Sequence, residues 1–215
     1  MEILFLSIIL TIEQRKNFKG CDSMQLRQHT DYWEERAEKV LSHFHYTYPD
    51  EIDLYDICWR YGMRVLPLDA PFMEELTGSD PIPRLKAFSL PEERGRRGTI
   101  FLKEGLDAIE KKLLLAEEFC HLYAHYQQQL SADQYTIGKC ENQAKRMAAY
   151  LLMPGQFIED VYADAYEAPV VISDIADYFL VTDELATYRM ELEFQRKVDG
   201  FVVSHGKLGT LEWIR

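Results

Sequence analysis

Residues 111–126 read KKLLLAEEFCHLYAHY, and the interpretation of the whole chain starts from this stretch. Apolar side chains recur through it at helical spacing, which predicts an amphipathic helix. Glu117, Glu118, His121 and His125 lie on that helix, and its remaining positions are mostly apolar. Residues four apart project from the same side of a helix, and neighbours are rotated by roughly 100°. The spacing therefore places Glu117 and His121 together, with Glu118 beside them.

This cluster differs by one residue from the pattern His-Glu-x-x-His, in which two imidazoles hold a metal ion and the glutamate activates a bound water. Glu117 stands where the pattern has its first histidine. The pattern predicts Glu117 and His121 as metal ligands and Glu118 as the general base. A second arrangement, in which His121 and His125 form the ligand pair, stays open. The sequence does not choose an oxyanion stabiliser among His125, Tyr123 and Tyr126.

A second segment, residues 140–154, reads CENQAKRMAAYLLMP. Its periodicity predicts a helix that Glu141 opens and Pro154 ends, with Ala144 and Ala148 on the same face as Glu141. A glutamate on a following helix can supply the third protein ligand of such a site and leave the fourth position to water. Small side chains one turn further on would let the two helices approach closely. Glu141 is therefore the predicted third ligand.

The two segments together resemble the ImmA/IrrE family of metallopeptidases, in which the metal helix is followed by Glu-x-x-Ala-x-x-(apolar)-Ala-x-x-Leu-Leu-Met-Pro. Glu141, Ala144, Ala148 and residues 151–154 match this motif in register. The resemblance implies an α+β fold with a zincin-like core of helices packed on a small antiparallel sheet. It also implies a cytoplasmic zinc endopeptidase of bacteria, prophages or mobile elements that regulates transcription by cleaving a helix-turn-helix repressor. The repressor substrate comes from the resemblance alone.

Glu117 is the departure from the family pattern, and it has chemical consequences. Two carboxylates and one imidazole neutralise a divalent cation, so a bound water would be less acidified than with two imidazoles. We therefore expect lower activity near neutral pH. An oxygen-rich ligand set also admits Mn²⁺ or Fe²⁺ beside Zn²⁺. The alternative is a catalytically weak or inactive relative that acts as a protein-binding regulatory module.

Composition limits the partners. The 215 residues are 47% hydrophobic, which is ample for a well-buried core. A formal net charge of −12 disfavours direct binding to nucleic acid or to anionic membranes. The four cysteines form no Cys-x-x-Cys pair and suggest no secreted disulfide framework, so a reducing cytoplasm is expected. The expected partner is a protein substrate.

Outside the two motifs, capping and periodicity predict the remaining elements. Asp31 and Asp50 mark the starts of two helices, the second ending at Gly62. Short runs separated by Pro and Gly predict an antiparallel sheet, on which the metal helix packs after a start at Asp107. The runs are residues 63–68, 84–90 and 98–103, and a loop is expected at 131–138.

The sequence predicts three parts of the chain: an N-terminal extension at 1–23 that need not belong to the fold, a metallopeptidase-like domain at 24–165, and a helical extension with a tail at 166–215. The extension has the rhythm of a helix-turn-helix, with Ser173 and Thr182 as predicted N-caps. A DNA-reading helix presents basic or amide side chains, whereas this pair is mostly acidic. We therefore expect it to serve as scaffold or substrate-recognition surface.

Overall fold

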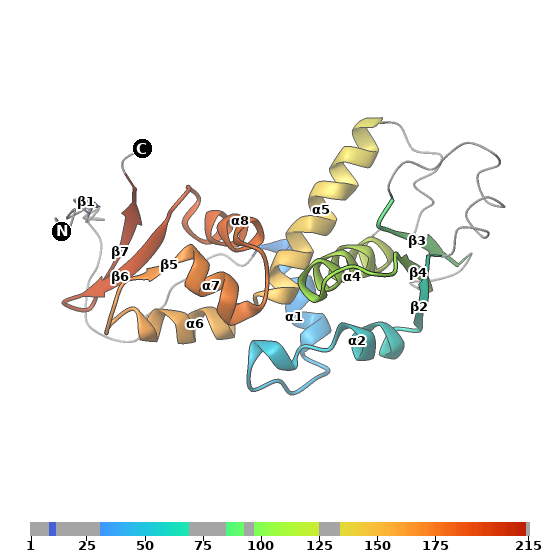
Figure 1. Cartoon of the computed structure of the whole chain (residues 1–215), viewed down its shortest axis with the longest axis horizontal. Coiled ribbons are helices and arrows are strands. Elements are labelled where there is room, and N and C mark those ends of the chain that lie inside the picture. Colours follow the sequence, from blue (N-terminus) through green and yellow to red (C-terminus); the bar gives the residue numbers. More distant parts are fainter. Residues whose placement is uncertain (1–8, 12–30, 69–84, 93–96, 125–133, 214–215) are drawn as a thin grey trace. The chain divides into compact units, whose positions relative to one another are not determined.

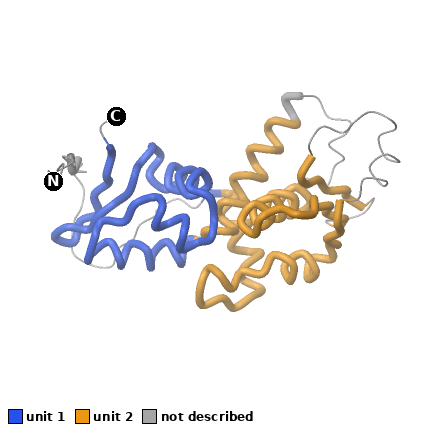
Figure 2. The backbone as a smooth tube through the Cα atoms, viewed as in Figure 1, with its two compact units in different colours: residues 1–31, 155–215 blue, residues 32–154 orange. Residues whose placement is uncertain are grey.

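The computed structural model describes residues 9–11, 31–68, 85–92, 97–124 and 134–213. They form two compact units (Figure 2). Unit 2 is Tyr32–Pro154, and unit 1 combines Met1–Asp31 with Gly155–Arg215. The sequence placed a domain boundary after residue 165, whereas the compact units divide the chain after Pro154. Unit 2 holds all the predicted metal-site residues that the structure describes.

Unit 2 begins with three helical elements (Figure 1). Helix α1 is Tyr32–Leu41, η1 is Pro49–Glu51 and α2 is Leu54–Arg60. The carboxylate of Asp53 accepts the backbone N–H groups of Tyr55 and Asp56 and so caps α2. Helix α1 begins where it was predicted, whereas α2 begins after Asp53 and not at Asp50, which lies in the separate η1 turn. The apolar faces of both helices enter the core of the unit.

A three-stranded sheet follows, with strands β2 (Met63–Pro67), β3 (Ala87–Pro91) and β4 (Gly98–Leu102) in the order β2-β4-β3. The predicted strands are confirmed, but the predicted antiparallel arrangement is wrong. Strand β4 pairs antiparallel with β3 and parallel with β2, so the sheet is mixed. The physical reason is that β4 inserts between the two earlier strands, and the chain from β2 to β4 is long enough for the crossover that a parallel pair requires.

Helix α4 (Ala108–Ala124) packs against β3 and β4, as predicted. Asp107 accepts the backbone N–H of Glu110 at 2.9 Å and fixes the start of the helix. Gly98 allows the close approach of helix and strand, because a Cβ atom there would lie 2.9 Å from a methyl carbon of Leu122. The helix that carries the predicted metal ligands is thus held firmly on the sheet.

Helix α5 (Gln134–Leu152) packs against α4 and α1. The prediction that Glu141 opens this helix is wrong, since the helix begins about two turns earlier. Gly138 made residues 131–138 look like a loop, but a helix tolerates a glycine at a cost of about 1 kcal/mol. Ala144 and Ala148 are buried, which permits the close helix packing that the sequence predicted.

Unit 1 joins three helices to an antiparallel sheet of order β1-β7-β6-β5. A tight turn at His205 and Gly206, both with positive φ, connects β6 to β7. Strand β1 comes from the N-terminal segment and pairs with β7. The elements are β1 (Ile9–Thr11), α6 (Gly155–Asp164), β5 (Val170–Val171), α7 (Ile172–Phe179), α8 (Asp183–Phe194), β6 (Gly200–Ser204) and β7 (Lys207–Glu212).

Helices α7 and α8 pack together at the place of the predicted helix pair. Thr182 caps α8 by accepting the N–H of Leu185, as predicted. Ser173 is not the cap of α7, which already begins at Ile172. There the carboxylate of Asp174 accepts the N–H of Val171. No helix within the described part of the chain combines the length and apolar character needed to cross a bilayer.

Candidate metal centre

The packing of α4 on α5 brings His121 and Glu141 into direct contact. The Nε2 atom of His121 lies 3.3 Å from Oε2 of Glu141. The imidazole is buried, whereas 55% of the Glu141 side chain is exposed. The contact therefore joins a buried nitrogen donor to a carboxylate that reaches solvent. The structure thus places two of the three predicted ligands together.

Glu117 and Glu118 stand one turn before His121 on α4, and the pKa of each is raised. Burial is the main cause for Glu117; the charge of Lys145 opposes it and that of Glu141 adds to it. Burial raises the pKa of Glu118 to about 7, against a hydrogen bond from Ser89 and with added repulsion from Glu141 and Glu117. The three carboxylates are therefore close enough to repel one another, and the partial burial of Glu117 and Glu118 strengthens that repulsion.

The pKa of His121 shifts in the opposite direction, downward, for the same reason. Burial lowers the pKa of its imidazole, while the charge and hydrogen bond of Glu141 raise it in part. The neutral imidazole is the form that binds a metal. Near neutral pH the site therefore presents a neutral nitrogen donor next to carboxylate oxygens.

This donor set fits a divalent cation chemically, because imidazole nitrogen and carboxylate oxygen are the ligand types that Zn²⁺ accepts. A cation would also offset the repulsion among the carboxylates. The fit is incomplete, however. Among the described residues, no group of three His, Cys, Asp or Glu side chains is arranged as a metal cluster. His121 and Glu141 meet, and Glu117 lies beside them without completing the group.

The sequence also offered His125, Tyr126 and Tyr123 as a possible metal ligand or as oxyanion stabilisers. His125 and Tyr126 lie outside the described residues, so the alternative His121 and His125 pair stays a prediction. Tyr123 is not available as an oxyanion stabiliser, because it is 2% exposed and packs in the core with its ring 5.4 Å from that of Tyr61. Its position, two residues after His121, turns it to the other side of α4.

Two residues that act on this site, Ser89 and Lys145, lie outside the motifs that predict it. Ser89 lies on β3 and shares the helix-facing side of the sheet with its cross-strand partner Ile100. The alternation of side chains along a strand predicts that Ser89 lies on this side of the sheet. Lys145 follows Glu141 by four residues on α5, so helix arithmetic could have placed both on one side. Neither was considered, because neither belongs to a metal-binding motif.

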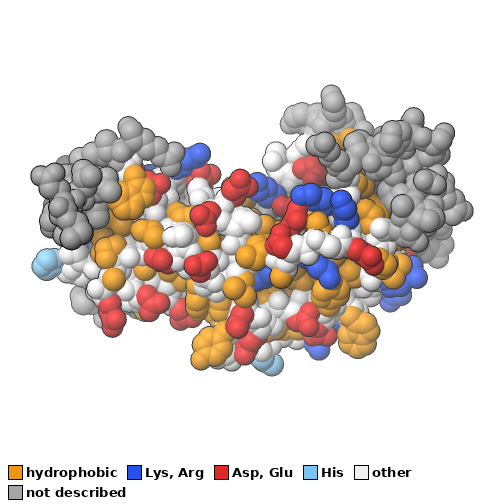
Figure 3. Space-filling model, in the orientation of Figure 1, with side chains coloured by type: hydrophobic (Ala, Val, Ile, Leu, Met, Phe, Trp, Pro, Cys, Tyr) orange, Lys and Arg blue, Asp and Glu red, His pale blue; other side chains and the backbone are white. Residues whose placement is uncertain are grey.

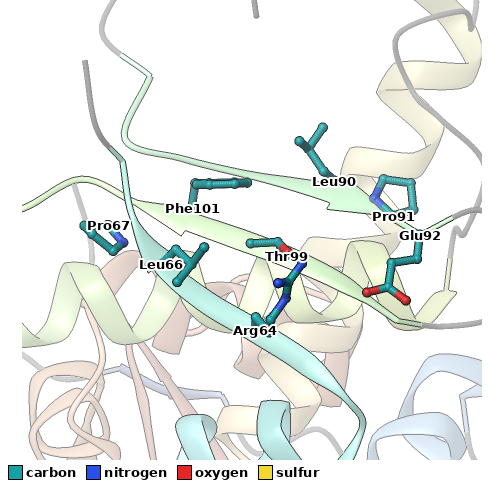
Figure 4. Close-up of a pocket in the computed structure, with 8 residues that line it drawn as sticks. All are labelled: Arg64, Leu66, Pro67, Leu90, Pro91, Glu92, Thr99 and Phe101. Carbon is teal, nitrogen blue, oxygen red and sulfur yellow. Dashed lines mark hydrogen bonds between the residues drawn. The ribbon is translucent and has the colours of Figure 1, made fainter. Parts of the chain in front are cut away.

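A groove of about 620 Å³ lies along the sheet, and it is not the metal centre (Figure 4). Leu90 lines it, next in sequence to Ser89, and successive strand residues point to opposite faces. The groove therefore opens on the face turned away from α4. Arg64 donates a hydrogen bond to Thr99 within it. The other lining residues are Leu66, Pro67, Pro91, Glu92 and Phe101.

The comparison with protein families agrees with this arrangement. The family model described as IrrE N-terminal-like domain (Peptidase_M78) matches residues 60–191, which include β2 to β4, α4 and α5. No curated protein matches the chain significantly. The match covers more than half of the sequence and both helices of the candidate centre. The chain therefore belongs to the M78 peptidase family with the IrrE N-terminal-like domain, and its function is of the metallopeptidase type.

Proposed function

We propose that this protein is a metal-dependent endopeptidase of the ImmA/IrrE type that uses Zn²⁺ and hydrolyses a peptide bond in a protein substrate. The observation that carries the proposal is the contact of His121 with Glu141 across α4 and α5, beside the buried Glu118. Both helices lie inside the family match. Mn²⁺ and Fe²⁺ are the alternative cations, because carboxylate oxygens accept them readily.

In this proposal His121, Glu141 and Glu117 would hold the cation, which when bound would acidify a water and polarise the substrate carbonyl. Glu118 is the general base. Its pKa of about 7 suits a group that takes a proton and returns it to the leaving amine near neutral pH. The hydrogen bond from Ser89 restricts the rotation of the Glu118 carboxylate and so orients it.

For the substrate we propose a helix-turn-helix repressor, as in the family that the sequence resembles. The net charge of −12 supports a basic protein partner, and acidic side chains occupy both units on the face drawn in Figure 3. DNA-binding proteins carry the basic surfaces that such a charge attracts. The free thiols of Cys58, Cys120 and Cys140 support a reducing, cytoplasmic setting.

The metal content of the purified protein tests the site. Plasma mass spectrometry after a weak chelator wash should find about one equivalent of zinc in the parent, as one three-ligand site implies. Glu117→Ala, His121→Ala and Glu141→Ala should each abolish it, whereas the exposed Glu104→Ala should not. A parent protein without metal under zinc-replete expression would refute the centre.

A second function is favoured by one observation, the absence of a three-residue cluster among the described residues. In that case the protein is a catalytically weak or inactive relative that binds a regulatory partner. Glu118→Gln separates the two functions, because a peptidase would lose turnover and keep its metal. Equal behaviour of parent and variant toward a cleavable repressor would support the binding module.

A further inference from the structure

Arg36 on α1 contacts the C-terminal end of α4, the helix that carries His121. Its Nη2 group donates a hydrogen bond to the backbone carbonyl of Tyr123 at 3.1 Å, and its Nη1 group donates one to the hydroxyl of Tyr32 at 2.7 Å. The guanidinium carbon also lies 5.0 Å from the centre of the Tyr123 ring, and 5.5 Å from the ring centres of Tyr32 and Trp33. Two hydrogen bonds and three aromatic rings thus determine where this guanidinium lies.

The carbonyl that Arg36 binds belongs to the last turn of α4, which ends at Ala124. Carbonyl groups in the last turn of a helix take hydrogen bonds from outside it, and the helix dipole favours a positive charge there. His121 precedes Tyr123 by two residues and lies in the same turn. Arg36 therefore holds the turn from which the imidazole of His121 projects.

The same contact also limits how α4 can move relative to α5. Helix α1 packs against α5, and α4 packs against α5 as well. Arg36 adds a direct connection between α1 and α4, so the three helices are joined to one another in pairs. Helix α5 carries Glu141, whose Oε2 atom lies 3.3 Å from Nε2 of His121. A shift of the end of α4 away from α5 would separate these two atoms, and the hydrogen bond of Arg36 opposes that shift.

We infer that Arg36 is a positioning residue of the metal centre, because its contact with the end of α4 keeps His121 close to Glu141. The inference rests on the proposed function. Arg36 acts through the backbone of α4 and has no contact with the two ligand side chains in the hydrogen bonds described above. A ligand pair that is held in place before the cation arrives loses less conformational freedom on binding, so the contact should raise the affinity of the centre.

Arg60 on α2 provides a matched control, since it makes the same two kinds of contact elsewhere in unit 2. Its Nη1 group donates a hydrogen bond to the backbone carbonyl of His43 at 2.9 Å, and its guanidinium lies 4.7 Å from the centre of the Phe44 ring. His43 and Phe44 lie outside α4 and α5. A comparison of Arg36→Met with Arg60→Met therefore separates the positioning of His121 from a general loss of stability.

The experiment is a Zn²⁺ titration of metal-stripped full-length protein against a chromophoric chelator of known affinity. Arg36→Met keeps much of the aliphatic stem and should weaken zinc binding about tenfold, the lower end of the range for groups that orient metal ligands. Arg60→Met should change the affinity by no more than about twofold, which is well below that range. Co²⁺ bound in place of zinc gives a second measurement, because its absorption spectrum depends on ligand geometry. The spectrum should change in Arg36→Met and stay that of the parent in Arg60→Met.

Equal zinc affinities of the two methionine variants would overturn the inference and leave the metal centre intact, and so would an unchanged Co²⁺ spectrum in Arg36→Met. A parent protein that binds no zinc would refute the metal centre and the inference with it. If circular dichroism shows that Arg36→Met does not fold, Arg36→Lys takes its place with Arg60→Lys as control. Lysine keeps the charge but lacks the planar fork that reaches both acceptors, so Arg36→Lys should also weaken zinc binding more than its control does.

Discussion

Replacing Glu118 by glutamine should stabilise the metal-free protein, and the gain should depend on pH. Burial raises the pKa of Glu118 from its ordinary 4.5 to about 7. Between these values the folded protein holds a proton that the unfolded chain has released, so the free energy of unfolding falls as pH rises. Each pKa unit corresponds to about 1.4 kcal/mol, which gives a cost of about 3 kcal/mol above pH 7. Glutamine has no such cost.

Urea unfolding of metal-free parent and Glu118→Gln, followed by tryptophan fluorescence and far-ultraviolet circular dichroism, measures this difference. The variant should be more stable by about 3 kcal/mol at pH 8 and by less than about 1 kcal/mol at pH 5, because pH 5 lies only just above the ordinary pKa of 4.5 at which the unfolded chain releases its proton. The exposed Glu104→Gln is the control and should show no comparable pH dependence. A stability gain of the same size at both pH values, or a loss at pH 8, would refute the reasoning that burial dominates at Glu118.

Three further changes test the surroundings. Ser89→Ala removes a hydrogen bond to the Glu118 carboxylate and should lower metal-free stability at pH 8 by about 2 kcal/mol, but by only about 1 kcal/mol in the Glu118→Gln background, where the acceptor is uncharged; no loss in the parent background in urea unfolding would exclude the bond. Arg189→Met removes the guanidinium that lies 3.0 Å from the buried carboxylate of Glu193, and it should destabilise unit 1 by about 3 to 5 kcal/mol, seen as a lower melting temperature. An unchanged melting temperature would mean that the pair contributes little. Asp53→Ala uncaps α2 and should cost about 1 kcal/mol in unit 2, and no change on urea unfolding would show that the cap is dispensable.

Local signals in the sequence were sufficient for most elements of unit 2. Asp107 precedes and caps a helix as the sequence predicted, whereas the second helix is capped by Asp53, three residues after the predicted start at Asp50. The three strands lie between Pro and Gly residues that end them. These features depend on neighbours within four residues, so a single chain reveals them.

Features that depend on distant pairing were not predictable in the same way. The sequence of β4 does not indicate that β2 is its neighbour or that the two strands run parallel. The packing of the whole unit determines this pairing. The start of α5 could not be predicted from Gly138, because a glycine occurs in loops and can also lie inside a helix.

In the candidate centre, the two motifs predicted that α4 and α5 would meet, and the contact of His121 with Glu141 is the geometry that they imply. The side-chain state of Glu117 was not predictable from the motif. Burial is the largest cause of its raised pKa, followed by the charges of Lys145 and Glu141, and these depend on how α5 packs against α4.

The order of strands in unit 2 also governs when the unit can fold. Strand β4 is central and buried at all five positions, yet it is the last of the three to leave the ribosome. Strands β2 and β3 pair with β4, so a nascent chain that ends before residue 98 lacks the strand that joins them. Helix α4 follows a few residues later and covers β3 and β4. The sheet and the metal helix should therefore form together in one cooperative step, which cannot begin until β4 has been synthesised.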